Sequence, residues 1–237
     1  MNSERKHISA LILAAGSGNR MQSDITKQMM NLDGESVVVR SVRAFEECAD
    51  ISSIVVVAKD DELSRIRDML FGKSSKLFAV VAGGKCRQES ALKGFAAIPS
   101  DAQFVAVHDA ARCLVLPEMI SKVVVSALKY GAATAGHPVY DTVKLVGKNG
   151  EISGTLNRDE LFVASTPQIF EKGIYERALR ASSDRLEHYT DDNMMVEAIG
   201  ESIATVNVGK ENLKITTQED LLLARLILER RKCLNIE

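Results

Sequence analysis

The chain has 237 residues, of which 46% are hydrophobic and 26% charged, so it is long and apolar enough to bury a sizeable core. Its net charge of -2 argues against a protein that coats nucleic acid or an anionic membrane, but it allows a local basic pocket for a small anion. We expect no membrane span, since no run of about 18 apolar residues occurs. The four cysteines form no C-x-x-C pair, which argues against a zinc site or a disulfide framework and favours a reducing cytoplasm.

Short β-branched runs alternate with longer amphipathic runs over the first 140 residues. This alternation is typical of βαβ units and a mainly parallel sheet. The predicted strands are residues 8–14, 53–58, 77–81, 103–109 and 132–139. The predicted helices are residues 36–48, 61–71, 88–97 and 117–130, the last with a proline at its first position. The strands are almost continuously apolar, which indicates a sheet covered by helices on both faces.

The pattern changes at Asp141. The stretch "DTVKLVGKNGEISGTLNRDELF" contains short alternating segments around "GKNG", which predicts a β-hairpin. We expect it to form an arm that projects from the sheet at about residues 140–158. The elements expected after it are helices at 170–181 and 191–199, strands at 203–207 and 213–215, and a helix at 217–231. The chain shows no internal repeat or flexible linker, so we predict a single domain, residues 1–237, with an inserted arm.

A glycine loop follows the first predicted strand in "LAAGSGNRM". Ligands of open α/β sheets bind at the carboxyl ends of the strands, where Gly16 and Gly18 stand. Glycines let backbone N–H groups approach an anion closely. Arg20 offers a planar fork for phosphate oxygens, and Lys27 offers a compact charge. Taken alone, the glycines are more simply interpreted as an ordinary turn with two solvated cations.

Two better-known glycine loops do not fit. The dinucleotide fingerprint G-x-G-x-x-G requires glycine where Met21 stands. The P-loop pattern fails in "AVVAGGKC", where Ala79 occupies the first glycine position and Cys86 the final hydroxyl position.

Two more motifs lie at predicted strand ends. In "GGKCRQES", residues 83–90, the glycines could accept a flat base and Ser90 could bond a base or sugar, while a plain turn with a helix cap is an equal alternative. In "HDAAR", Asp109 could hold a ribose hydroxyl or a divalent metal, and Arg112 could bind a phosphate. His108 is more simply interpreted as a core histidine.

The chain contains the motifs "LAAGSGNRM" with "KQ" at Lys27 and Gln28, "AGGKCRQES", "VHDAAR", "PVYDTVK", "TPQIF", "YTDDNMMVE" and "ENLKITTQEDLLLA". In these motifs, from about residue 8 to 228, it resembles the 2-C-methyl-D-erythritol 4-phosphate cytidylyltransferase family. The resemblance implies an α/β fold of the nucleotide-diphospho-sugar transferase type. This is a Rossmann-like, mainly parallel sheet with helices on both faces and an inserted β-hairpin arm.

The reaction that the resemblance implies transfers CMP from CTP to 2-C-methyl-D-erythritol 4-phosphate, with Mg²⁺, and releases pyrophosphate. The attacking phosphate is already an anion, so no general base is required. Catalysis then consists of bringing two polyanions together and neutralising the transition state. The resemblance implies that Arg20, Lys27 and Lys214 do this together with the metal ion.

The resemblance also implies binding roles for further residues. The residues expected at the nucleotide are Ala14, Ala15, Gly16, Gly18, Gly84, Ser90 and Asp109, with Asp109 also facing the metal. The residues expected at the sugar-alcohol phosphate are Arg112, Thr142, Arg158, Thr166 and Thr190, together with Lys214. Thr142 and Arg158 are expected to reach from the arm into the neighbouring subunit's site, which implies a homodimer. Taken singly, each threonine could be an ordinary strand or cap hydroxyl.

The chain departs from the family at Thr26 and Cys113, which stand where proline is usual. Both changes are expected to loosen a loop without removing a charge. A ribitol 5-phosphate cytidylyltransferase is the alternative within the class, although Ala111 favours the erythritol enzyme. A non-catalytic nucleotide-binding protein and a NAD-dependent oxidoreductase are the alternatives from other classes. The catalytic cations argue against the first, and the failed fingerprint argues against the second.

Overall fold

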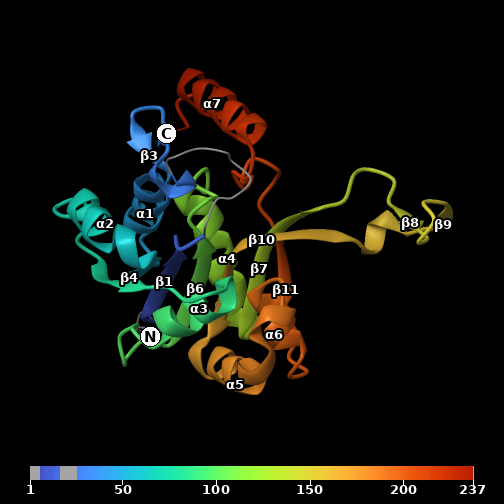
Figure 1. Cartoon of the computed structure of the whole chain (residues 1–237), viewed down its shortest axis with the longest axis horizontal. Helices are drawn as coiled ribbons and strands as arrows, with labels where there is room; N and C mark the ends of the chain where they lie inside the picture. The colour runs from blue at the N-terminus through green and yellow to red at the C-terminus, as the bar shows by residue number, and fades with distance from the viewer. Residues whose placement is uncertain (1–5, 17–25, 237) are drawn as a thin grey trace.

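The computed structural model describes residues 6–16 and 26–236, which are built around one seven-stranded sheet (Figure 1). The strand order is β11-β7-β10-β6-β1-β4-β5. The strands are β1 (Ile8–Leu13), β4 (Ser53–Ala58), β5 (Leu77–Ala82), β6 (Phe104–Asp109), β7 (Ala132–Pro138), β10 (Phe162–Glu171) and β11 (Ala204–Asn207). Strand β10 pairs antiparallel with both β6 and β7, and the other pairings are parallel. The sheet is therefore mainly parallel, as predicted.

Helices cover both faces of the sheet, because successive strand residues point to opposite sides. On β1, Ala10 and Ile12 belong to the core cluster that includes helices α1 (Val37–Glu47), α2 (Leu63–Leu70) and α4 (Pro117–Tyr130). Leu11 and Leu13 belong to the opposite cluster, with α3 (Arg87–Phe95), α5 (Lys172–Ser182) and α6 (Asp192–Glu197). The two-sided apolar strands that the sequence shows thus have a helix layer on each side.

Helix α7 (Gln218–Cys233) forms a third, smaller cluster at the carboxyl end of the sheet. It begins with a capping box between Thr217 and Asp220. Its buried side chains pack on Ile215 and on the loop after β6. The body also contains a short hairpin of β2 (Asn31–Leu32) and β3 (Glu35–Ser36). Its 3₁₀ helices are η2 (Lys27–Met29), η3 (Asp60–Glu62) and η5 (Ser183–His188). None of the helices in the described part of the chain is long and apolar enough to cross a membrane.

The segment between β7 and β10 forms an arm. Strands β8 (Lys144–Val146) and β9 (Ile152–Thr155) pair antiparallel, and the 3₁₀ helix η4 (Arg158–Glu160) follows them. Figure 1 shows this hairpin projecting well away from the sheet. Its apolar side chains Leu145, Val146 and Ile152 are largely exposed.

Two predictions about the elements are wrong. Strand β10 was not predicted, and the helix expected from residue 170 begins only at Lys172. Residues 162–169, which precede the predicted helix, contain Pro167 and three polar residues, and this pattern argues against a strand. In the structure the pairing with β7 is irregular between Ala164 and Gln168, so Pro167 lies where the ladder is interrupted.

The second error is the strand expected at residues 213–215. The structure has no strand there: Ile215 N–H donates a single backbone hydrogen bond to Ala111 O at 2.8 Å. Side-chain and backbone contacts hold this segment, because Asn212 donates to Thr166 O at 2.7 Å and Arg112 donates to Asn212 O at 3.0 Å. We call residues 212–215 the strap, because they run across the loop after β6.

Glu46, near the end of α1, fixes the turn that leads into β5. Its carboxylate accepts hydrogen bonds from the hydroxyl groups of Ser74 and Ser75, both at 2.6 Å, and from the N–H groups of Ser75 and Lys76. Burial alone raises the pKa of Glu46, but these hydrogen bonds outweigh it and lower the pKa to about 2.

We therefore expect Glu46→Gln to destabilise the protein by about 1–3 kcal/mol near neutral pH. The folded pKa lies below the ordinary value of 4.5, so the stabilisation is present above about pH 4.5 and is lost as the pH falls towards 2. Urea unfolding at several pH values measures this, with the exposed neighbour Glu47→Gln as control. Equal stability of the two variants would contradict the prediction.

Candidate active site

Two adjoining pockets lie at the carboxyl edge of the sheet. The larger pocket, about 450 Å³, is lined by Leu13, Ala15, Gly16, Lys27, Gln28, Lys59, Gly84, Lys85, Cys86, Arg87, Ser90, Asp109, Ala111 and Lys214. The smaller pocket, about 320 Å³, is lined by Arg87, Asp109, Arg112, Ala164, Ser165, Thr166, Gln168, Thr190, Asp191 and Lys214. Arg87, Asp109 and Lys214 line both pockets, so we call these three residues the shared wall.

The topology of the sheet explains why these residues meet. Strands β1, β4, β5 and β6 are parallel, so their carboxyl ends lie at one edge. Strand β10 runs the other way, which brings Thr166, near its middle, beside the end of β6: Asp109 N–H donates to Thr166 Oγ1 at 3.0 Å. The strap after β11 then returns Lys214 to the same place.

Charge pairing holds the shared wall together. Lys214 Nζ lies 2.7 Å from Asp109 Oδ2, and Arg87 Nε lies 2.9 Å from Asp109 Oδ1. Burial by itself raises the pKa of Asp109, but the positive charges of Arg87 and Lys214 outweigh this and hold its pKa well below the usual range. Asp109 is therefore a carboxylate at any physiological pH.

His108 lies behind this wall and is a core residue. It is fully buried, its Nδ1 lies 3.1 Å from Thr166 Oγ1, and its ring packs on Phe45. Burial lowers the pKa of His108 to about 3, so the imidazole is neutral. It cannot act as a general base, because it does not line either pocket.

The loop from Gly83 to Ser90 forms one side of the larger pocket and requires its glycines. A Cβ on Gly83 would lie 2.5 Å from the Ala15 Cβ, and one on Gly84 would lie 2.4 Å from Glu89 Cγ. Gly84 N–H donates to Ser90 Oγ at 3.0 Å, and Ser90 Oγ donates to Cys86 O at 2.9 Å. Ser90 therefore closes this loop through its own hydroxyl while lining the pocket.

The opposite side of the larger pocket is formed by the end of β1 and by η2. The buried Gln28 donates from Nε2 to Gly16 O at 3.1 Å. The Lys27 side chain lies beside Gly16, since a Cβ built there would be 3.6 Å from Lys27 Cε. Ala14 continues β1 and donates its N–H to Val57 O at 2.7 Å. Gly18 and Arg20 lie outside the described residues.

The residues expected at the sugar-alcohol phosphate divide into two groups. Arg112, Thr166 and Thr190 line the smaller pocket. Thr142 and Arg158 are exposed on the arm and line neither pocket, and Arg158 donates to Tyr140 O at 3.2 Å. The fold of one chain thus brings the first group to the shared wall and leaves the second group away from it.

The structure adds three cations that the sequence analysis did not single out, namely Lys59, Lys85 and Arg87. With Lys27 and Lys214 they face a single lining carboxylate, Asp109, among the described residues. The larger pocket is therefore strongly basic although the whole chain is not. Lys59 directly follows β4 as the glycine loop follows β1, and this position at a strand end could have identified it from sequence.

The described residues contain no group of three or more His, Cys, Asp or Glu side chains that could hold a metal ion. Among the described residues that line the larger pocket, Asp109 is the single carboxylate and thus the candidate ligand. A carboxylate has about four lone-pair positions, and Arg87 and Lys214 use two of those on Asp109. The site therefore fits a divalent cation of the Mg²⁺ type, which takes few protein carboxylates and most of its ligands from substrate phosphates and water.

The two residues that depart from the family pattern, Thr26 and Cys113, have different surroundings. Thr26 donates its hydroxyl to Glu62, which ties the start of η2 to η3. Cys113 is buried in the α7 cluster, and burial raises the pKa of its thiol to about 12. The Cys113 thiol is consequently protonated and unreactive at physiological pH.

Comparisons with known proteins show which family the chain resembles over nearly its whole length. The family model described as 2-C-methyl-D-erythritol 4-phosphate cytidylyltransferase matches residues 8–230. The enzyme of that name from Desulforamulus reducens is 38% identical to the chain, and the alignment covers 96% of the chain and 98% of the relative. The one from Symbiobacterium thermophilum is 39% identical, and the alignment covers 95% of each. The crystal structure of 4-diphosphocytidyl-2C-methyl-D-erythritol synthase from Anaerococcus prevotii superposes with a TM-score of 0.85 at 28% identity, covering 95% of this chain and all of that one.

Lys59 offers a specific test of the larger pocket. It is half-buried, and its side chain forms no hydrogen bond or ion pair with another described residue. We expect Lys59→Gln to raise the KM for the nucleoside triphosphate about 5- to 10-fold with little change in kcat, because a ground-state charge contact is lost. Steady-state kinetics measure this against Lys122→Gln on the exposed surface of α4, which makes the same change of charge away from both pockets. An unchanged KM would place Lys59 outside the binding site.

Proposed function

The chain belongs to the 2-C-methyl-D-erythritol 4-phosphate cytidylyltransferase family, and from this premise we propose how its two pockets carry out the reaction. The enzyme transfers CMP from CTP to 2-C-methyl-D-erythritol 4-phosphate in non-mevalonate isoprenoid biosynthesis. The products are 4-diphosphocytidyl-2-C-methyl-D-erythritol and pyrophosphate.

The observation that carries the proposal is the shared wall between the pockets. CTP occupies the larger pocket and the sugar-alcohol phosphate the smaller one, so the two reacting phosphates meet at Arg87, Asp109 and Lys214. Holding both reactants in one geometry converts a bimolecular step into an effectively unimolecular one. The excess of lysines in the larger pocket supports its assignment to the triphosphate.

Binding roles follow from this assignment. The backbone of Ala14, Ala15, Gly16 and Gly18 contacts the nucleotide, Gly84 and Ser90 contact the cytosine, and Asp109 contacts the ribose. On the other side of the wall, Arg112, Thr166 and Thr190 contact the phosphate of the acceptor. The lining of the two pockets supports every described member of these sets except Ala14, which immediately precedes a lining residue.

The acceptor phosphate attacks the α-phosphorus of CTP in line with the departing pyrophosphate. The P–O bond to pyrophosphate breaks as the new one forms, and no proton needs to be removed from the anionic nucleophile. Negative charge accumulates on the oxygens of the α-phosphoryl group, and Arg20, Lys27 and Lys214 neutralise it. Because His108 is neutral and buried, the described residues at the wall offer cations but no imidazole base.

Mg²⁺ is the proposed cofactor, with Asp109 as its protein ligand. When bound, it would neutralise triphosphate charge and help to orient the leaving group. The free lone pairs of the Asp109 carboxylate support this assignment.

The compartment and the oligomeric state are also part of the proposal. All four cysteines are free thiols, which supports a reducing cytoplasm. The exposed apolar side chains of the arm support a homodimer, because a two-stranded hairpin by itself is marginally stable in water. In that dimer, Thr142 and Arg158 of each arm complete the smaller pocket of the partner subunit.

Substrate specificity tests the proposed function directly. We expect CTP with 2-C-methyl-D-erythritol 4-phosphate to give the highest kcat/KM in a pyrophosphate-release assay that pairs each nucleoside triphosphate with each sugar phosphate. Ribitol 5-phosphate is the critical competitor, since a ribitol enzyme would share nearly all the phosphate-binding motifs. A higher kcat/KM with ribitol 5-phosphate would overturn the assignment of the acceptor.

Subunit exchange tests the shared site. Lys27→Ala and Arg158→Ala are each expected to be nearly inactive. Lys27→Ala loses a transition-state contact, which lowers kcat about 100-fold, and Arg158→Ala loses a contact that positions the acceptor phosphate. If Arg158 serves the partner's site, a heterodimer of the two variants has one site with both lesions and one with none. Random exchange then makes about half of the dimers mixed and restores about a quarter of the wild-type activity.

A fluorescence label on each variant confirms that exchange has taken place. Each variant mixed with itself is the matched control. A mixture that exchanges but stays inactive would show that Arg158 acts within its own chain.

A further inference from the structure

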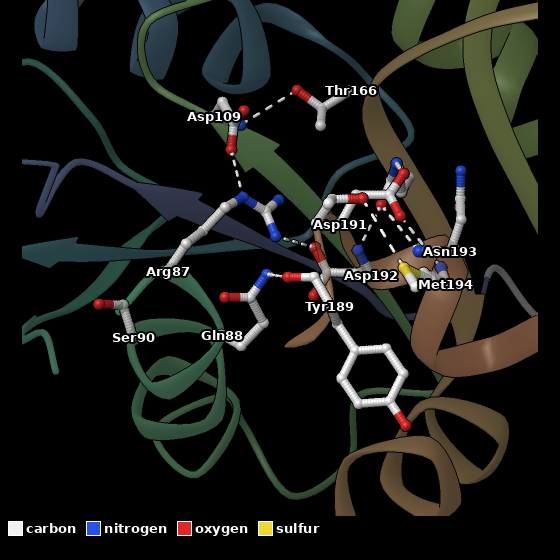
Figure 2. A network of polar contacts seen from close by, with 12 residues as sticks. Arg87, Gln88, Ser90, Asp109, Thr166, Tyr189, Asp191, Asp192, Asn193 and Met194 are labelled. Carbon is white, nitrogen blue, oxygen red and sulfur yellow. Dashed lines mark hydrogen bonds and ion pairs between the residues drawn. The ribbon is translucent and has the colours of Figure 1, made fainter. Parts of the chain in front are cut away.

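Arg87, the first residue of α3, links three elements of the site through one side chain. Its Nε lies 2.9 Å from Asp109 Oδ1 at the end of β6, and its Nη1 lies 2.6 Å from Asp192 Oδ2 at the start of α6. Figure 2 shows the guanidinium between the two carboxylates. Arginine suits this position because its planar fork presents several donors in a fixed geometry, which lysine cannot reproduce.

The Asp192 end of this contact is fixed from the core. Asp192 is fully buried, and its Oδ1 accepts the hydroxyl of the buried Tyr175 at 2.6 Å. Its N–H donates to Gln168 Oε1 at 3.1 Å. Gln88, next to Arg87, donates to Tyr189 O and so ties α3 to the same loop (Figure 2). Asp192 is therefore a rigid support for the Arg87 guanidinium.

The Asp109 end leads to Lys214. One oxygen of Asp109 binds Arg87 and the other binds Lys214, so the orientation of this carboxylate determines where the ammonium group of Lys214 lies. The positive charge of Arg87 is shared between Asp109 and Asp192. Without Arg87, Asp109 would attract Lys214 more strongly, and the Lys214 ammonium group would be less available to incoming phosphates.

We propose that Arg87 is a positioning residue: anchored on Asp192, it orients Asp109 and thereby holds Lys214 on the wall between the nucleotide and acceptor pockets. This inference rests on the proposed roles of Asp109 and Lys214. Arg87 acts through these two residues, so its effect should appear in the use of the acceptor more than in the stability of the fold.

The test must separate positioning from a structural role, because Arg87→Met alone leaves the buried Asp192 charge uncompensated and is expected to destabilise the protein. Asp192→Asn removes that charge and retains an oxygen for Tyr175. The informative comparison is therefore Arg87→Met/Asp192→Asn against Asp192→Asn alone. Asp109 keeps Lys214 as a counter-ion in the double variant, so we expect both proteins to be folded and to unfold cooperatively above the assay temperature. We expect kcat/KM for 2-C-methyl-D-erythritol 4-phosphate to fall about tenfold or more, since small displacements of a positioning group can cost up to about 100-fold.

Two further variants complete the design. In the Asp192→Asn background, Arg87→Lys should not restore kcat/KM, because an ammonium group lacks the fork that spans both positions. In the same background, Arg87→Met should lower kcat/KM much less when Lys214→Gln is already present than when Lys214 is intact. The reason is that the effects of residues that act through one another are not additive.

The outcomes distinguish an error in the proposed site from an error in the positioning role of Arg87. If Lys214→Gln has wild-type kinetics, the proposed site is wrong. If Lys214→Gln is impaired but Arg87→Met has no kinetic effect in the Asp192→Asn background, or a fully additive effect with Lys214→Gln, the site stands and the positioning role of Arg87 is overturned.

Discussion

The paired charges around the Asp109 carboxylate are the interaction on which the site depends. A carboxylate placed at the end of a buried strand is costly unless cations compensate it, and Arg87 and Lys214 do so from two distant parts of the chain. The result is a wall between two pockets in which Arg87 is shared by Asp109 and the buried Asp192. A reaction between two polyanions requires a surplus of positive charge, which Lys27, Lys59 and Lys85 add in the larger pocket.

The sheet places this wall where the strands can supply it. Parallel strands deliver the glycine loop after β1, Lys59 after β4, the loop of Gly83 after β5 and Asp109 after β6 to one edge. The single antiparallel strand, β10, adds Thr166 to that edge without a further crossover. The same strand carries the chain back from the arm, so the arm leaves and rejoins the body at the edge where the pockets lie (Figure 1).

Much of this could be predicted from local sequence. The alternation of apolar strands and amphipathic helices depends on burial, which side-chain chemistry determines directly, and the ends of β4 and α4 coincide with the predicted ends. Strand β10 escaped prediction because Pro167 and its polar neighbours are unusual in a central strand. The sheet accommodates these residues because the hydrogen-bond ladder between β10 and β7 is interrupted there, and no local sequence pattern reveals this interruption.

The sequence by itself determined the fold class, the glycine loops and, through its motifs, the family and the cations Lys27 and Lys214. Only the tertiary structure decided how these residues are paired. Arg87 and Asp192 are more than one hundred residues apart, as are Asp109 and Lys214, and nothing in either neighbourhood specifies the partner. Ion pairing acts through space, so which carboxylate meets which cation depends on the order and direction of the strands that carry them.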